Sequence, residues 1–182
     1  MIINKGKTES LRKFYERDKY SILKQNSTFD DLKDLAQFWE DIVDQNSERF
    51  SKNILRKLFT LNYAPNSMWN YFISVYYMAN RNKNGDLNAK EFEIFLDRTI
   101  AFIWGYAIIH PGVNALRTPL FAEMLNIVNL NEVTFSEFKF NKEKTRSAIV
   151  IYDFKNGRPI TKSMLALRMM LNNEQVLPKL SQ

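Results

Sequence analysis

Apolar residues recur along most of this chain at the three- and four-residue spacing of a helix that buries one face. We therefore predict these helical stretches: 8–24, a helix that opens at an N-cap on Thr28, 50–61, 68–79, a helix from a cap on Asn88 to about Ile109, 113–129, 142–152 and 161–172. The predicted fold class is all-α, an irregular bundle of about six to eight helices with a central αα-hairpin.

The helix that opens at Thr28 is predicted to be amphipathic, with Asp31 at position N3. Its predicted core side comprises Leu32, Leu35, Ala36, Trp39, Ile42 and Val43. The other side carries Asp30, Asp31, Asp34, Glu40, Asp41 and Asp44. We interpret these acids as a solvated face rather than a metal site, because no histidine or turn converges on them.

Two stretches are predicted to lie deep in the protein. Residues 68–79 contain no charged side chain, so we expect this helix to be buried on nearly all sides. The apolar run from Ile100 to Ile109 is half the length of a membrane span and is interpreted as a buried helix. The three tryptophans fall within helical stripes and are predicted to be core residues.

Composition supports a helical protein. Aromatic residues make up 14% of the 182 residues, and Gly and Pro number five each, too few for a fold rich in tight turns. There is no cysteine, and the N-terminus lacks the apolar stretch of a signal peptide. We expect one domain over 1–182, a cytoplasmic location and no membrane partner.

The stretch from Asn80 to Glu91 has nearly the spacing of an EF-hand calcium loop. Oxygen-bearing side chains stand at loop positions 1, 3, 5, 9 and 12, and glycine stands at position 6: Asn80, Asn82, Asn84, Asn88, Glu91 and Gly85. Four of these ligand positions are neutral amides, however, and three cationic side chains lie in the same loop. The simpler interpretation, which we prefer, is an αα-hairpin loop in which Asn88 and Glu91 form a capping box.

The chain offers little else for catalysis. The only histidine, His110, stands at a predicted helix end without a Cys, Ser or second His to act with. Phosphate-binding glycine loops and zinc-ligand spacings do not occur in the sequence. We therefore assign no catalytic residue, no metal ligand and no cofactor, and we leave open whether the protein is part of an enzyme.

The positive charge of the chain is concentrated in its last quarter. Residues 139–182 hold nine Lys or Arg against three acids, whereas the two signs balance in residues 1–138. The candidates for phosphate contact, through which DNA would bind, are Lys142, Lys144, Arg146, Arg158 and Lys162. The alternative is an ordinary solvated basic surface.

Several stretches resemble the helical region between the two catalytic domains of GmrSD-type modification-dependent restriction endonucleases. They are "RFSKNILRKLFTLNYAPNSMWNYF" (49–72), "FIWGYAIIHPGVNALRTPLFAEMLNIVN" (102–129), "NGRPITKSMLALRMM" (156–170) and "LP" (177–178). The resemblance covers most of the chain from about residue 28. "PGVNALRTP" and "NGRPITKSML" are its most distinctive parts.

The resemblance implies a role without catalysis for this segment. In that family a nucleotide-hydrolysing domain carries an Asp-Gly-Gln-Gln-Arg signature and an HNH-type nuclease carries a His-rich signature, and neither occurs here. The resemblance therefore implies a helical module of a DNA endonuclease that restricts modified, often glucosylated, phage DNA. Its partners would be the two catalytic domains of the parent protein. The alternative is a free-standing helical interaction protein, with the degenerate calcium loop as a minor variant.

Asn114 and Arg117 in "PGVNALRTP" are the remaining candidates. At i, i+3 spacing they would share one face of the predicted helix 113–129. A guanidinium beside an amide suits fixed hydrogen bonds to carbonyls or a carboxylate. We expect the pair to fix the preceding "HPG" turn against a neighbouring helix or against a missing domain.

Overall fold

Helices and their connecting loops make up the part of the chain that the structure describes. The computed structural model describes residues 10–110, 114–136 and 138–151. In these ranges the helices are α1 (Leu11–Glu16), α2 (Asn26–Val43), α3 (Lys52–Leu61), α4 (Met68–Asn80), α5 (Ala89–Ile109), α6 (Arg117–Val128) and α7 (Lys142–Ile151). No strand occurs in the described ranges, so the predicted all-α fold class is confirmed.

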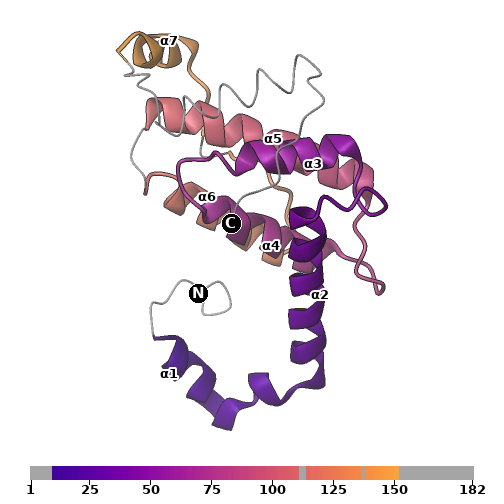
Figure 1. The fold of residues 1–182 in the computed structure, drawn as a ribbon. Coiled ribbons are helices and arrows are strands. Elements are labelled where there is room, and N and C mark those ends of the chain that lie inside the picture. The colour runs from indigo at the N-terminus through magenta and orange to yellow at the C-terminus, as the bar shows by residue number, and fades with distance from the viewer. Residues whose placement is uncertain (1–9, 111–113, 137, 152–182) are drawn as a thin grey trace.

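The helices from α2 to α7 pack in an irregular bundle, whereas α1 lies apart from it (Figure 1). α4 packs on α6 and on α2, while α5 packs on α3 and α7. Aromatic rings stack between helices: Phe38 with Tyr77 at 4.1 Å and Tyr76 with Phe95 at 3.8 Å between centroids. Phe135, in the loop before α7, stacks on Phe102 of α5 at 4.2 Å. The high aromatic content therefore supplies the contacts between helices.

The loop between α4 and α5 is a tight turn shaped by its glycine and asparagines. Gly85 adopts φ +81°, a conformation that costs other residues energy. The side-chain oxygen of Asn82 accepts hydrogen bonds from the backbone N–H of Asn84 at 2.8 Å and of Asp86 at 2.9 Å. Asn88 caps α5 by accepting from the backbone N–H of Lys90 and Glu91, both at 3.1 Å. The asparagines of this loop thus shape the turn between two helices.

A buried ion pair connects this loop to α2. The guanidinium of Arg49 donates to the carboxylate of Asp41 and, at 2.5 Å, to the backbone carbonyl of Gly85. The Tyr77 hydroxyl donates to the same carbonyl at 3.1 Å, and Asn46 donates to Asp41 at 2.9 Å. Two stretches that are distant in sequence, 41–49 and 77–85, are therefore joined by one hydrogen-bonded group.

The pKa of Asp41 reflects these contacts. Burial by itself would raise the pKa of this carboxyl, because burial disfavours the charged form. Hydrogen bonds from Asn46 and Arg49, together with the charge of Arg49, outweigh burial and hold the pKa below its ordinary value of 3.8. Asp41 is therefore an ionised, structural carboxylate.

The predicted solvated acidic face of α2 is wrong for Asp41, and two further members, Asp31 and Asp34, are ion-paired while remaining partly exposed. Asp41 is 8% exposed and paired with Arg49. Arg81 donates to both Asp31 and Asp34, the latter at 3.1 Å, and so ties the N-terminal half of α2 to the end of α4. Sequence periodicity could not reveal these pairs, because both arginines come from other segments of the chain.

The predicted core side of α2 is also partly wrong. Phe38 is fully buried and Ile42 is 1% exposed, whereas Leu32 is 59% exposed and Val43 is 36% exposed. Ala36 is exposed as well. Leu32 lies in the N-terminal part of α2, which extends away from the bundle (Figure 1). Ala36 and Val43 lie on the opposite side of the helix from the buried Phe38.

Several predicted helix boundaries differ from the structure. The stretch 8–24 is not one helix: α1 is followed by 3-10 turns at Arg17–Tyr20 and Ile22–Lys24, and Lys19 and Tyr20 have positive φ. α2 begins at Asn26 with Gln25 as its N-cap, so Thr28 lies inside the helix, where its hydroxyl donates to the Ile22 carbonyl at 2.6 Å. α6 begins at Arg117 rather than near 113.

The remaining helices agree closely with the predicted ranges. α3, α4, α5 and α7 begin and end within two residues of the expected positions, and "AIVI" is helical despite its strand propensity. The run from Ile100 to Ile109 forms the end of α5. No described helix has both the length and the apolar character needed to cross a bilayer. The predicted helix 161–172 lies outside the described residues.

Candidate functional site

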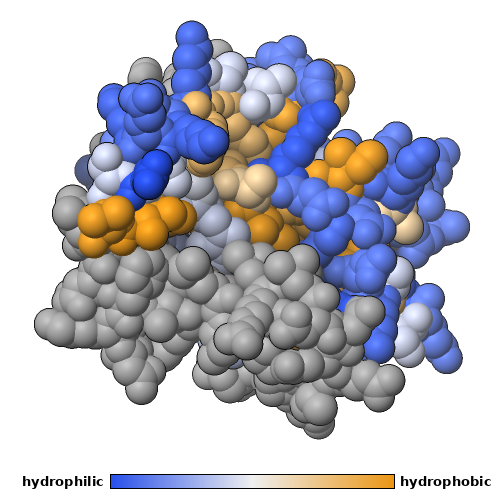
Figure 2. Space-filling model, turned by 90° about the horizontal axis from the view of Figure 1, so that it is seen from above, coloured by the Kyte–Doolittle hydropathy of each residue, from blue (hydrophilic) through white to orange (hydrophobic). Residues whose placement is uncertain are grey.

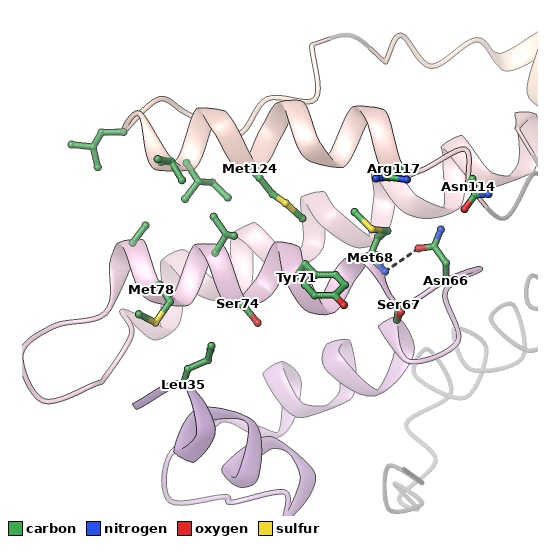
Figure 3. Close-up of a pocket in the computed structure, with 15 residues that line it drawn as sticks. Leu35, Asn66, Ser67, Met68, Tyr71, Ser74, Met78, Asn114, Arg117 and Met124 are labelled. Atoms are coloured by element: carbon green, nitrogen blue, oxygen red, sulfur yellow. Dashed lines mark hydrogen bonds between the residues drawn. The ribbon is translucent and has the colours of Figure 1, made fainter. Parts of the chain in front are cut away.

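A long groove runs between α4 and α6, and we call it the α4–α6 groove (Figure 3). Its volume is about 1030 Å³, and Leu35 of α2 borders it on one side. Its apolar walls include Met68, Val75, Met78, Met124, Ile127 and Val128. The groove is therefore a largely apolar hollow between two roughly parallel helices.

The groove exists because α4 is not buried on all sides, contrary to the prediction from its lack of charge. One side of α4 packs into the core through Trp69, Phe72, Ile73 and Tyr77. The other side faces the groove, where Tyr71 is 63% exposed. This face of α4, which the described residues leave uncovered, presents apolar and hydroxyl groups.

Hydrogen bonds fix the wall where α2 meets α4. The Ser74 hydroxyl donates to the carbonyl of Asn70 at 2.7 Å and accepts from the indole N–H of Trp39 at 3.0 Å. Trp39 is half-buried, whereas Trp69 and Trp104 are buried as predicted. The α2–α4 junction therefore holds its shape through a specific polar contact as well as through apolar packing.

One end of the groove is polar. Asn66, Asn114 and Arg117 lie at this end, beside the N-termini of α4 and α6 (Figure 3). The Asn66 side chain accepts from the backbone N–H of Met68 at 3.0 Å. Arg117 is the one charged side chain among the described residues that line the groove.

The structure changes the predicted relation between Asn114 and Arg117. Asn114 lies in the turn before α6, so the pair does not share a helix face as expected. The backbone carbonyl of Asn114 instead accepts from the Arg117 N–H at 3.1 Å, and both residues are exposed at the polar end of the groove. Their predicted structural or inter-domain role stays a prediction.

The predicted phosphate contacts are only partly described. Lys142, Lys144 and Arg146 are exposed on α7, whose first turn is held by the Asn141 side chain accepting from the Lys144 N–H at 2.8 Å. Lys142 and Arg146 are one turn apart and face the same side, whereas Lys144 is rotated by roughly 200° from Lys142. Arg158 and Lys162 lie outside the described residues.

The surface seen from above carries hydrophobic residues gathered between hydrophilic ones (Figure 2). Phe140 before α7 is 64% exposed and Val150 near its end is 78% exposed. A second hollow lies beside α5, where Gly105 allows the ring of Phe138 to approach the helix. Aromatic rings form much of this hollow, and the ion pair between Arg98 and Glu132 also lines it.

Other candidates for chemistry are not assembled. His110 ends α5, is exposed, and lies 4.5 Å from the Tyr106 ring between centroids. Within the described ranges, no group of three or more His, Asp or Glu side chains is placed to hold a metal ion. The α4–α6 groove is therefore the candidate site.

No family model, curated protein or solved structure matches this chain. The resemblance to the GmrSD-type endonucleases therefore rests on the sequence stretches alone and supports a proposal rather than a family assignment.

Sequence reasoning did not find the groove. Its signal was the charge-free stretch 68–79, which indicates burial but does not say whether the same chain supplies the cover. Asp41, Arg49 and Arg81 were likewise not predicted as structural residues. Their pairings join positions up to 50 residues apart and depend on how the helices cross.

Proposed function

We propose that this chain is a non-catalytic helical module of a modification-dependent DNA restriction protein involved in phage defence, in which it couples the nucleotide-hydrolysing and nuclease domains. The observation that carries the proposal is the α4–α6 groove. Its walls are apolar, and one cationic side chain lies among the described residues that line it. Such a surface suits docking of another protein element.

Nuclease or nucleotidase chemistry would need a different kind of site. Phosphoryl transfer relies on positioned metal ions, acids and bases. The residues around the groove are mainly apolar or neutral, so they are suited to binding. The sequence resemblance to the middle region of GmrSD-type endonucleases supplies the specific identity of the parent system.

A free-standing helical interaction protein is the second candidate, because the same groove would serve it equally well. The two candidates differ in their partners. A restriction module should be encoded in the same reading frame as an HNH nuclease or next to one, whereas an interaction protein need not be.

Phage challenge tests the proposal directly. Cells would express the HNH nuclease and the nucleotide-hydrolysing domain encoded in that neighbourhood with this chain, without it, or with its Val128→Glu variant. They would then be infected with phage that carries glucosylated DNA. We expect protection only with the wild-type chain, because Val128 forms part of the groove wall. Protection that does not depend on the chain, or a neighbourhood without a nuclease frame, would reject the proposal.

A further inference from the structure

We propose that the α4–α6 groove binds one amphipathic helix of a partner protein, antiparallel to both α4 and α6, with an acidic residue at the end near Arg117. The proposal deepens the proposed function by naming the occupant of the groove, and it rests on that function only for the source of the helix. Dimensions, charge and the chemistry of the walls each support it.

The length of the groove fits a helix of three to four turns. α4 has 13 residues and α6 has 12, so each is roughly 18–20 Å long at 1.5 Å per residue. Labelled residues from Arg117 and Met68 at one end to Met78 at the other show the groove following both helices (Figure 3). A helix that lays apolar residues into such a groove uses positions i, i+3, i+4 and i+7.

The backbone of the groove walls favours a helix over an extended strand. Both walls are α-helices, whose backbone groups bond within the helix. A strand lying there would find no free sheet edge, and its own backbone N–H and C=O groups would lose water without gaining partners. A helix satisfies its own backbone and can bury an apolar face at no such cost.

Charge determines the direction of the bound helix. α4 and α6 both begin at the Arg117 end, so their positive dipole ends lie together there (Figure 3). The N-cap residue of α6, Leu116, makes no side-chain hydrogen bond, whereas the Asn66 side chain accepts from the first backbone N–H of α4. The C-terminal end of a bound helix, with its negative dipole and an acidic side chain, complements Arg117 and these two ends.

The apolar walls suit side chains of a partner. Met68 and Met78 are half-buried, unbranched and adaptable, and so can fit the side chains of a bound helix. Val128 and Leu130, which are 51% and 87% exposed, continue the apolar wall beyond Ile127. The occupant therefore needs apolar residues along its length and acidic ones at its C-terminal end.

A designed peptide provides the probe. A fluorescein-labelled helical peptide of about 14 residues would carry leucines at i, i+3, i+4, i+7 and i+11, with two glutamates in its last turn. A matched peptide would carry two lysines in place of those glutamates. Fluorescence anisotropy with the full chain should show at least roughly tenfold tighter binding of the acidic peptide, because only that peptide complements the Arg117 end.

Three protein variants separate the groove from the rest of the surface. Val128→Glu should weaken both peptides by at least about tenfold, because it places a charge in the apolar wall. Val150→Glu makes the same change on exposed α7, outside the groove, and should bind as wild type does. Arg117→Glu should abolish or reverse the preference for the acidic peptide. Thermal melts would confirm that each variant folds. If Arg117→Glu does not fold, Arg117→Gln takes its place.

Several results would overturn the proposal. They are no binding of the acidic peptide, equal binding of both peptides, and an unchanged preference in folded Arg117→Glu or Arg117→Gln. A wild-type dimer that Val128→Glu dissociates would also overturn it, since the groove would then hold a second copy of this chain.

The helix proposal and the proposed function can fail separately. If the acidic peptide binds as expected but Val128→Glu still supports phage protection, the restriction role is wrong and the helix site stands. If Val128→Glu abolishes protection but the two peptides bind alike, the restriction role stands and the acidic helix is wrong.

Discussion

At the residue scale, Asp41 makes stability depend on pH. Its folded pKa lies below the ordinary 3.8, so the ionised carboxylate stabilises the fold above about pH 4, and this contribution is lost as the pH falls through the folded pKa. We expect Asp41→Asn to lower the free energy of unfolding by about 1–3 kcal/mol near pH 7, because Arg49 loses its charged partner. Urea unfolding at about pH 7 and pH 3 would measure both effects.

The difference in the free energy of unfolding between wild type and Asp41→Asn should be smaller at pH 3 than at pH 7. Asp44→Asn is the matched control, because Asp44 is an exposed residue one turn further along, and its effect should stay within about 0.5 kcal/mol. A difference between wild type and Asp41→Asn that is the same at both pH values would contradict the structural role of the carboxylate.

Replacing Gly85 or Gly105 by alanine should have different effects on the free energy of unfolding. Gly85 has φ +81°, and a Cβ there would lie 3.2 Å from the Tyr77 hydroxyl, so Gly85→Ala should destabilise by about 1–2 kcal/mol. Gly105 is helical, and its Cβ would meet Phe138 at an ordinary 3.4 Å, so Gly105→Ala should be neutral or stabilise by up to about 1 kcal/mol. Urea unfolding compares the two, and equal destabilisation would contradict the two local conformations.

At the element scale, the α4–α5 loop should not respond to calcium. The Asn82 side chain already accepts two backbone hydrogen bonds, Asn88 caps α5, and the Asp86 carbonyl accepts from the Asn82 N–H at 2.8 Å. Releasing these oxygens for an ion would cost the turn its own bonds. Calorimetric titration should therefore give no site with a dissociation constant below about 10⁻⁴ M, which functional EF-hands reach, and the melting temperature should not change with calcium.

Helix positions could be predicted from the sequence where local signals decide them. Asn88 caps α5 as expected, and the predicted range 68–79 ends within one residue of the observed end of α4. The exposed face of α4 and the burial of Phe38 could not be predicted, because both depend on which helix lies opposite. The same reason applies to the groove: periodicity shows that a face is apolar but not what covers it.

At the scale of the whole molecule, the isolated chain should have no nuclease or nucleotidase activity. The described residues offer no cluster of metal ligands, and the sequence lacks the signatures of both catalytic domains. Incubation with glucosylated DNA, or with nucleoside triphosphates, in the presence of magnesium or manganese should leave the substrates intact. Metal-dependent turnover that follows the protein through successive purification steps would contradict this expectation.

The contact between Trp39 and Ser74 gives the molecule a built-in optical signal. The indole of Trp39 donates to a fixed hydroxyl, and its ring lies 5.8 Å from that of Trp69, close enough for the two chromophores to exchange excitation energy. Separation of α2 from α4 would move Trp39 into water, shift its emission to longer wavelength and uncouple the pair. Because Leu35 of α2 also borders the groove, an occupant that moves α2 would change the emission spectrum of the unlabelled protein.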